Sequence, residues 1–452
     1  MMNRRKFMGT AAAAAGWMIV PRRVLGGPGH IAPSDRINVG CIAVGGRGFD
    51  DTRSAAAENV VALCDVDNAK IAKFLKADSH TPEQKAMFEK AIPYQDWRRM
   101  LDAEKGLDAV TIATPDHNHA TIAMAALKQG KHVYCEKPLT HTLKEARLLA
   151  EEAGRSKLAT QMGNQGHAQE GIRLIREWIS DGAIGEVTEV HVWTNRPIWP
   201  QGIDAPKETP AVPDGFDWDI WLGPAPWRPY HPAYCPNDWR GWWDFGVGAL
   251  GDMGAHLIDQ PFWALDLGAP ETVQASSTPF NNQTYPLGEI ITYRFPARGT
   301  RPPVTMMWYD GGLMPPRPAL SSLEDGRMMG DEGGGCLFVG RKGRLVCSTY
   351  GGSPRLLPEK LMQDYARPPK LIPRSPGIMP EWFAAIKSGK KSSSDFTAYA
   401  GPLTEVMLLG IAALRFKDSN IALQWDPVKM EFPNLPEANP FIHKKYREGW
   451  SL

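Results

Sequence analysis

The chain has 452 residues, of which 51 are Lys or Arg and 50 are Asp or Glu. This length exceeds what one small hydrophobic core can organise and indicates two domains. Because the charges balance and the basic residues are scattered, no overall field would recruit nucleic acid or an anionic membrane, and we expect neither as a partner.

The first 33 residues predict an export signal and a linker. Arg4 and Arg5 form a twin-arginine pair before an Ala-rich apolar run from Gly9 to Val20. That run is too short to span a bilayer as a stable anchor, so we expect no membrane span. The signal predicts that the Tat translocase carries the folded protein to the periplasm. The alternative is an uncleaved basic N-terminus on a cytosolic protein.

Residues 34–162 predict a cofactor domain of the Rossmann type, an α/β fold with a doubly wound parallel sheet. Short apolar segments alternate with helical ones, as in the strand expected over 108–114 and the helix expected over 120–127. This alternation is typical of parallel sheets covered by helices.

A glycine-rich turn follows the apolar segment 37–43. Residue 43 is Ala where the pattern G-x-G-x-x-G usually begins,. Backbone N–H groups of such a turn, together with the start of the next helix, can cradle a pyrophosphate. The residues expected to contact it are Gly45, Gly46, Arg47 and Gly48.

A carboxylate closes the next apolar segment, Val60–Asp65. Asp65 can accept hydrogen bonds from a ribose diol and would repel a 2′-phosphate, so we expect NAD rather than NADP. Arg47 would soften that preference. The alternative is two ordinary core strands joined by a glycine turn.

The segment 131–138 places Lys137 at the end of a buried strand expected over His132–Cys135. Pro138 prevents simple continuation of the ladder. We expect Glu136, the neighbour of the ammonium group, to hold its charge and direction. The alternative is a surface lysine in a strand-to-helix turn.

A third constellation lies in the glycine-containing segment 246–259, which has helical character. Asp252 and His256 are four residues apart and share one helix face,. The carboxylate is expected to hold the tautomer of the imidazole and raise its basicity. No further ligands occur at motif spacing, so we expect no metal. The alternative is a helix N-terminal Asp beside a satisfied core His.

The chain resembles the Gfo/Idh/MocA family of sugar oxidoreductases in four motifs and in their order. These are the glycine turn, the stretch 113–119, Glu136-Lys137-Pro138 and Asp252-x-x-x-His256. The resemblance implies that Lys137 is the proton donor or acceptor at the reacting hydroxyl, that His256 assists it, and that Asp252 orients the substrate or the His. It also implies further cofactor contacts from Thr114, Pro115, Asp116, Asn118, His119, Glu136, Lys137, Pro138, Asn164 and Gln165.

Residues 163–430 predict an α+β domain with an open, largely antiparallel sheet. Strands are expected over 186–194, 290–295, 304–309 and 337–347, and a late helix over 402–416 is expected to pack on the cofactor domain. Residues 431–452 form a tail. In the family, the exposed face of this sheet is the usual subunit interface, so the resemblance implies a dimer or tetramer.

Aromatic residues crowd the region from about 190 to 245, in a chain with 16 Trp. Aromatic faces pack well against the C–H faces of sugars. The alternative is a loop-rich segment held together by buried aromatic side chains. The candidate substrate residues are His167, Trp193, Tyr230, Arg240, Trp243 and Asp244.

The combined features predict an exported NAD-dependent enzyme that transfers hydride between the nicotinamide and a hydroxyl-bearing carbon of a sugar or sugar derivative. Outside the cytoplasm no ready NAD pool recycles a released cofactor, which favours tight binding and a cycle that restores NAD. One alternative is therefore a redox-neutral glycoside hydrolase, working by oxidation, elimination, hydration and reduction, or an epimerase. A second is a non-catalytic periplasmic NAD-binding module.

Overall fold

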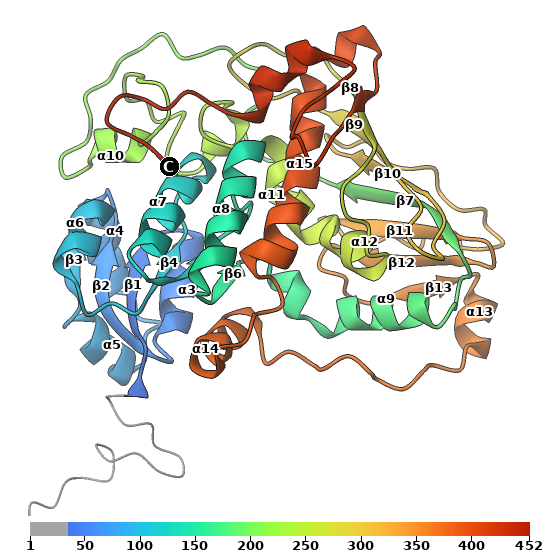
Figure 1. Ribbon diagram of the computed structural model, residues 1–452, viewed down its shortest axis with the longest axis horizontal. Helices are drawn as coiled ribbons and strands as arrows, with labels where there is room; N and C mark the ends of the chain where they lie inside the picture. Colours follow the sequence, from blue (N-terminus) through green and yellow to red (C-terminus); the bar gives the residue numbers. More distant parts are fainter. Residues whose placement is uncertain (1–34) are drawn as a thin grey trace, which may run out of the picture.

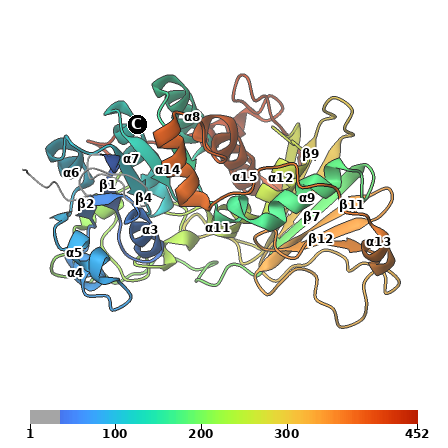
Figure 2. The same cartoon turned by 90° about the horizontal axis from the view of Figure 1, so that it is seen from below.

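The computed structural model describes residues 35–452, so the expected export signal and linker at 1–33 lie outside the described residues. The described chain forms two sheets that lie at opposite ends of the molecule, with helix α15 between them (Figures 1 and 2). The order of the two sheets along the chain confirms the predicted fold class.

The N-terminal sheet is parallel, and its strand order β3-β2-β1-β4-β5-β6 confirms the predicted doubly wound topology. In such sheets, ligands bind beyond the carboxyl ends of the strands where the strand order reverses, here between β1 and β4. The strands are β1 Asn38–Ile42, β2 Asn59–Cys64, β3 Ile92–Tyr94, β4 Ala109–Ile112, β5 His132–Cys135 and β6 Thr160–Met162.

Helices connect these strands and cover the sheet (Figure 1). Helix α8 shows why one of them starts where it does: Thr142 and Glu145 form a capping box, in which each side chain accepts from the backbone N–H of the other,. The helices are α3 Arg47–Ala55, α4 Asn68–Leu75, α5 Pro82–Phe88, α6 Trp97–Ala103, α7 Asp116–Lys128 and α8 Leu143–Ser156.

The second sheet has the order β13-β12-β11-β7-β10-β9-β8-β14. Strands β7 and β10 pair in parallel, while the other neighbours pair antiparallel, which confirms a largely antiparallel sheet. The strands are β7 Val187–Thr194, β8 Thr272–Ser277, β9 Glu289–Phe295, β10 Val304–Tyr309, β11 Gly334–Gly340, β12 Arg344–Ser348, β13 Arg355–Leu357 and β14 Leu423–Gln424.

Two details of this sheet differ from the sequence prediction. The single strand expected over 337–347 is a hairpin, because β11 and β12 pair with each other across a short turn. Strands β8, β13 and β14 were not among the predicted strands. The helices of this part are α9 Glu170–Ser180, α10 Trp218–Leu222, α11 Gly248–Leu257, α12 Asp259–Ala264, α13 Glu359–Asp364, α14 Ile378–Ser388 and α15 Gly401–Leu414.

Helix α15 lies between the two parts of the molecule, in contact with α8 on one side and β8 on the other. The stretch Phe396–Leu414 is apolar and long enough to cross a membrane by length and composition, but 78% of that window is buried inside the protein. Its apolar character therefore reflects core packing on both sides.

Helix α14 returns to the N-terminal sheet. Its Trp382 is fully buried, and the indole N–H donates to the carbonyl of Ala159 at 3.1 Å. Trp382 and Phe383 belong to the same hydrophobic core as Val39 and Val60 of β1 and β2. The range 34–162 expected for the cofactor domain therefore leaves out a helix that packs in its core.

The last residues cross the N-terminal ends of α7 and α8. Lys444 Nζ donates to the carbonyl of His117 at 3.1 Å and pairs with Glu145 at 3.1 Å. Arg447 Nε donates to the carbonyl of Gly223, just after α10, at 3.1 Å. The tail thus ties the α10 segment to the cofactor domain (Figure 1).

Candidate active site

The glycine turn after β1 has the shape that a pyrophosphate cradle requires. A Cβ on Gly48 would lie 1.9 Å from the carbonyl oxygen of Ala43, so helix α3 can approach β1 this closely only with glycine there. Gly46 has φ 54°, a left-handed conformation that favours glycine,. Ala43 has φ 65° although it carries a Cβ, and its N–H donates to Cys64 O at 2.7 Å. The turn keeps its shape without the first glycine of the pattern.

A cavity opens at the carboxyl ends of the N-terminal strands, next to this turn. Residues from the cofactor domain form one wall, and the segment around α10 covers the other side, tied down by the tail. The first wall includes Gly45, Gly46, Arg47, Asp65, Thr114, Pro115 and Asn118, and the cover includes Phe216, Trp221, Cys235, Trp239 and Arg240.

Asp65 lies in this cavity at the end of β2. Its two carboxylate oxygens accept backbone N–H groups of Val44 and Asp67, each at 3.0 Å. Burial raises the pKa of Asp65 to about 6, against the effect of these hydrogen bonds,. The carboxylate is therefore oriented by the backbone and ionised at neutral pH, as recognition of a ribose diol requires.

The Glu136 carboxylate pairs with Arg47 instead of with Lys137. Arg47 pairs with Asp51 at 3.1 Å and with Glu136 at 3.4 Å. Glu136 also accepts from Gln165 Nε2 at 2.7 Å. The expectation that Glu136 holds Lys137 is wrong, because the carboxylate is buried on the side of Arg47 and Gln165.

Lys137 is held by Asp252 of α11. Its Nζ donates to Asp252 Oδ1 at 2.7 Å and to the carbonyl of Asp252 at 2.8 Å. The Lys137 side chain is 14% exposed and that of Asp252 10% exposed. The reading of Lys137 as a freely solvated surface lysine is therefore excluded.

Asp252 also accepts from Arg240 Nε at 3.1 Å, and Arg196 Nε lies 3.7 Å from its other oxygen. Burial would raise the pKa of Asp252, but the charges of Lys137 and Arg240 and the Lys137 hydrogen bond outweigh it and hold the pKa well below its usual range. The expected Asp252–His256 pairing is wrong, because the carboxylate is drawn toward the cations.

His256 lies one turn further along α11 and is 3% exposed. Its Nδ1 is buried and has no hydrogen-bond partner in the described part of the chain. Burial, and then the charge of Lys137, lower the pKa of His256 well below its ordinary value. The ring meets Tyr350 edge-on, with centroids 4.9 Å apart. His256 is therefore a neutral imidazole beside a cation.

Helix α7 begins with side chains that hold the surrounding loops. Asp116 Oδ2 accepts from Val247 N at 3.1 Å, and burial raises the pKa of Asp116 to about 7. The ring nitrogens of His117 contact the carbonyls of Phe245 and Trp221 at 3.1 and 2.9 Å, and burial lowers its pKa to about 3. These contacts join the cofactor domain to the segment that precedes α11.

His119 links two loops of the cofactor domain. Its ring nitrogens contact the carbonyls of Pro138 at 2.7 Å and Thr114 at 2.8 Å, and burial lowers its pKa to about 4. His119 therefore positions the residues on either side of the cavity mouth and is fully engaged in doing so.

Two orphaned polar atoms test whether a nicotinamide cofactor fits here. Thr114 Oγ1 and Asn118 Oδ1 are buried and have no hydrogen-bond partner among residues 35–452, and both residues line the cavity. Buried polar atoms are normally paired. Together with the crowded Gly48, they indicate that the residues present suit a bound dinucleotide.

Asn164 and His167 meet at a buried carboxylate of the second domain. Asn164 Nδ2 and His167 Nδ1 contact Asp259 Oδ1 at 3.3 and 2.9 Å, and Tyr399 OH donates to it at 2.6 Å. The carbonyl of His167 accepts from Arg173 at 2.8 Å. His167 is thus part of a packing network.

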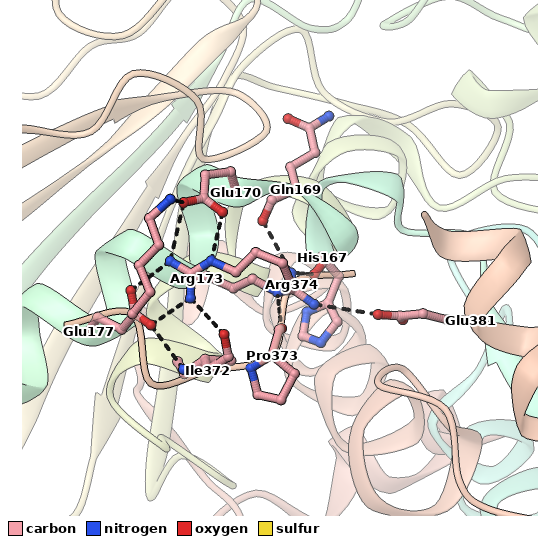
Figure 3. Close-up of polar contacts among 10 residues, drawn as sticks. His167, Gln169, Glu170, Arg173, Glu177, Ile372, Pro373, Arg374 and Glu381 are labelled. Carbon is pink, nitrogen blue, oxygen red and sulfur yellow. Dashed lines mark hydrogen bonds and ion pairs between the residues drawn. The ribbon is translucent and has the colours of Figure 1, made fainter. Parts of the chain in front are cut away.

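That network continues along α9 and fastens the segment before α14 (Figure 3). Arg173 donates to the carbonyl of Pro373 at 2.9 Å. Arg374 pairs with Glu177 at 2.6 Å and with Glu170 at 2.8 Å. These contacts explain why His167 is buried and place it in the joint between the two parts of the molecule.

The other aromatic candidates have separate structural roles. Trp243 packs on Tyr285, with ring centroids 3.6 Å apart, and lines a different cavity beside α15. Asp244 accepts from Arg228 at 2.7 Å. The structure does not bring Trp243 and Asp244 to Lys137, because each is already paired elsewhere.

Trp193 lies in a small core on the outer face of the second sheet, with Leu323 and Met329. Tyr230 packs edge-on against Trp218, 5.4 Å between centroids, at the back of the cavity cover. Of the candidate substrate residues, Arg240 is the one that both lines the cavity and contacts the Lys137–Asp252 pair.

Sequence reasoning missed Arg196 and Tyr350. Arg196 follows β7, and Tyr350 follows β12, so both sit where strands of the second sheet end near α11. A basic residue directly after a buried strand was the available signal for Arg196. Tyr350 had no such signal, because its contact with His256 joins segments that are far apart in the sequence.

Among residues 35–452, no group of three or more His, Cys, Asp or Glu side chains is arranged to hold a metal ion. A cavity at the carboxyl ends of a doubly wound sheet, a lysine fixed by a carboxylate that Arg240 of the cavity wall also contacts, and a second mixed sheet define a two-domain, dinucleotide-binding oxidoreductase fold,.

Two family models match the chain: "Oxidoreductase family, NAD-binding Rossmann fold" over residues 39–164, and "Oxidoreductase family, C-terminal alpha/beta domain" over residues 175–297. Together they cover more than half of the 452 residues. The chain belongs to the Gfo/Idh/MocA oxidoreductase family.

Curated relatives share part of the sequence. Levoglucosan dehydrogenase of Pseudarthrobacter phenanthrenivorans is 29% identical over 164 residues, which is 36% of this chain and 34% of the relative. A glycosyl hydrolase family 109 protein of Stenotrophomonas maltophilia is 30% identical over 140 residues, 30% of this chain and 29% of the relative. The chain thus spans about a third of the length of each.

Solved structures share the fold over a larger part. The WlbA dehydrogenase of Bordetella pertussis, in complex with NADH and UDP-GlcNAcA, aligns with a TM-score of 0.58 over 86% of this chain and 99% of that chain, at 16% identity. This likeness supports the two-domain fold described above.

Proposed function

We propose that the protein is an NAD-dependent oxidoreductase that acts on a hydroxyl or keto group of a sugar or sugar derivative. The observation that carries the proposal is the position of Lys137: its Nζ is fixed by two hydrogen bonds to Asp252, and Arg240 links this pair to the dinucleotide cavity. The partial matches to sugar-related relatives support the same reaction class.

When bound, the nicotinamide supplies a hydride acceptor for the carbon that carries the hydroxyl. During oxidation Lys137 takes the hydroxyl proton as the neutral amine and becomes the ammonium, and during reduction the ammonium returns that proton to the keto oxygen. An ammonium group has three N–H donors, and Asp252 accepts two of them, so the third remains for the substrate oxygen,. His256 is buried one helical turn along α11 from Asp252, and its lowered pKa makes it a weak proton acceptor, so the proton exchange is assigned to Lys137.

We propose NAD rather than NADP as the cofactor. The ionised Asp65 at the end of β2 would repel a 2′-phosphate, and Arg47 is engaged by Asp51 and Glu136,. Titration of NADH and NADPH fluorescence with the purified protein tests this, and tighter binding of NADPH would contradict it.

The reaction is tested by adding a panel of sugars and aryl glycosides to the cofactor-loaded protein and recording absorbance at the reduced-nicotinamide band. Stoichiometric reduction by a sugar is expected. Lys137→Met should abolish it while cofactor fluorescence is retained. If that variant left all measurable behaviour unchanged, the protein would instead be a non-catalytic NAD-binding module.

A redox-neutral glycoside hydrolase is the second candidate. The partial match to a glycosyl hydrolase family 109 protein favours it. Sustained aglycone release without net reduction of the cofactor would establish this activity over the dehydrogenase.

We propose export through the Tat pathway and assembly into a dimer or tetramer, both from the sequence and the family resemblance. Replacing Arg4 and Arg5 by Lys in a reporter fusion should block export, and unchanged export would contradict the signal. Sedimentation of residues 35–452 measures the oligomeric state directly, and a monomer would contradict the assembly.

A further inference from the structure

The charges around Asp252 do not balance. Among the described residues, Lys137 Nζ at 2.7 Å, Arg240 Nε at 3.1 Å and Arg196 Nε at 3.7 Å all face this one carboxylate. The side chains of Arg240 and Arg196 are 29% and 24% exposed, so each is largely withdrawn from water. One negative charge offsets one of three positive charges, and keeping the remainder close together is unfavourable.

Nearby acids do not supply the missing charge. Glu136 is occupied by Arg47, which is also paired with Asp51. Asp116 is buried, accepts a backbone N–H and has a pKa raised to about 7 by burial, so only part of its population is ionised at neutral pH. Within residues 35–452, Asp252 is therefore the carboxylate that pairs with Lys137, Arg240 and Arg196, and no second carboxylate forms an ion pair with any of the three.

Both arginines have donors left over. Arg196 Nε is buried and has no hydrogen-bond partner within residues 35–452. Arg240 lies over the ring of Trp239, 4.2 Å from its centroid, and lines the cavity beside the cofactor wall. Arginine forks match oxyanions, whose oxygens can accept two N–H groups at once, and stacking on an aromatic ring holds the fork in place.

We infer that the substrate is an anionic sugar, whose carboxylate or phosphate group binds between Arg196 and Arg240 while its reacting hydroxyl meets Lys137. This inference rests on the proposed function, because it specifies the substrate class of the same site. Asp252 holds Lys137, and the incoming oxyanion supplies the charge that the arginines lack.

The test compares sugars that differ in the group at C6: glucose with a neutral hydroxymethyl, glucuronate with a carboxylate and glucose 6-phosphate with a phosphate, together with their methyl glycosides. For the cofactor-loaded wild type, kcat/KM is expected to be about 10- to 100-fold higher for the acidic member that fits, because a charge-assisted hydrogen bond contributes that much. Glucuronate and glucose 6-phosphate distinguish a carboxylate from a phosphate site.

Arg196→Gln is the variant of choice, because its contact with Asp252 is the longest and its loss leaves the other two contacts intact. It should raise KM for the acidic sugar about 10- to 100-fold with little change in kcat, and Arg196→Lys should restore part of it. Arg341→Gln, at a side chain 71% exposed and paired with Glu186, is the matched control and should change neither constant.

A second readout is independent of turnover. In the presence of NADH, glucuronate or glucose 6-phosphate should raise the melting temperature of the wild type more than glucose does, and Arg196→Gln should remove the difference.

Equal turnover of neutral and acidic sugars would overturn the inference but leave the proposed function standing. Weaker NADH binding by Arg196→Gln, with unchanged sugar preference, would overturn it by assigning the charge to the cofactor. No reduction with any sugar would instead refute the proposed function.

Discussion

The raised pKa of Asp65 predicts how the affinity for NADH depends on pH. Burial raises its pKa to about 6 in the free protein, against the hydrogen bonds from the backbone N–H groups of Asp67 and Val44 and the charge of Lys70. Because the folded pKa lies above the ordinary value, the stability contribution of this group is present below about pH 4 and is lost as pH rises through 6. The ionised form, which a ribose diol recognises, therefore predominates only above that pH.

The affinity for NADH should follow the ionised fraction of Asp65. Between pH 7 and 8 the dissociation constant is expected to be flat, and below pH 6 it should rise about tenfold per pH unit, since one proton competes with the ligand. Fluorescence titration of NADH at pH 5.5 to 8 measures this, with circular dichroism to confirm folding. Asp65→Asn should bind more weakly at pH 8 and show no such slope. A wild-type dissociation constant that stays flat down to pH 5.5 would refute the reasoning.

Three substitutions test other parts of the structure. Lys137→Met should lower kcat about 10²- to 10⁴-fold without changing NADH affinity, and a loss shared by Lys137→Arg would show that a positive charge at this position is insufficient without the amine. Gly48→Ala should abolish NADH binding, because its Cβ would lie 1.9 Å from a backbone carbonyl, whereas Gly106→Ala, whose Cβ meets no described heavy atom within 4 Å, should bind normally. Trp382→Ala, at a fully buried side chain, should reduce the free energy of unfolding by about 3–5 kcal/mol in urea titrations, whereas Trp227→Ala, 68% exposed, should have little effect,.

Local patterns predicted the elements of the cofactor domain well, because each strand and turn there is encoded by neighbouring residues. The strand at His132–Cys135 was predicted at the observed bounds. Strand β8 was missed because Thr272–Ser277 is rich in polar residues, and its pairing with β9 rather than its own composition makes it a strand,.

The site could be predicted as a set of residues but not as a set of contacts. The spacing of Asp252 and His256 on one helix face suggested a pair, yet the carboxylate turns to Lys137 and Arg240 instead. Sequence spacing reports which side chains share an element. It does not report that Lys137 from the cofactor domain and two arginines from distant parts of the second domain surround Asp252, and with these three cations present the charge interactions decide the geometry,.

The return of helix α14 to the first sheet has a consequence for how the protein is made. Between β6, which ends at Met162, and α14, which begins at Ile378, the ribosome adds about 200 residues, and at ~5–20 residues per second this takes roughly 10–40 s,. During that interval the apolar surface that Trp382 later covers is exposed on the nascent chain. The tail that fastens the cavity cover arrives later still. The domain that is synthesised first is therefore completed last.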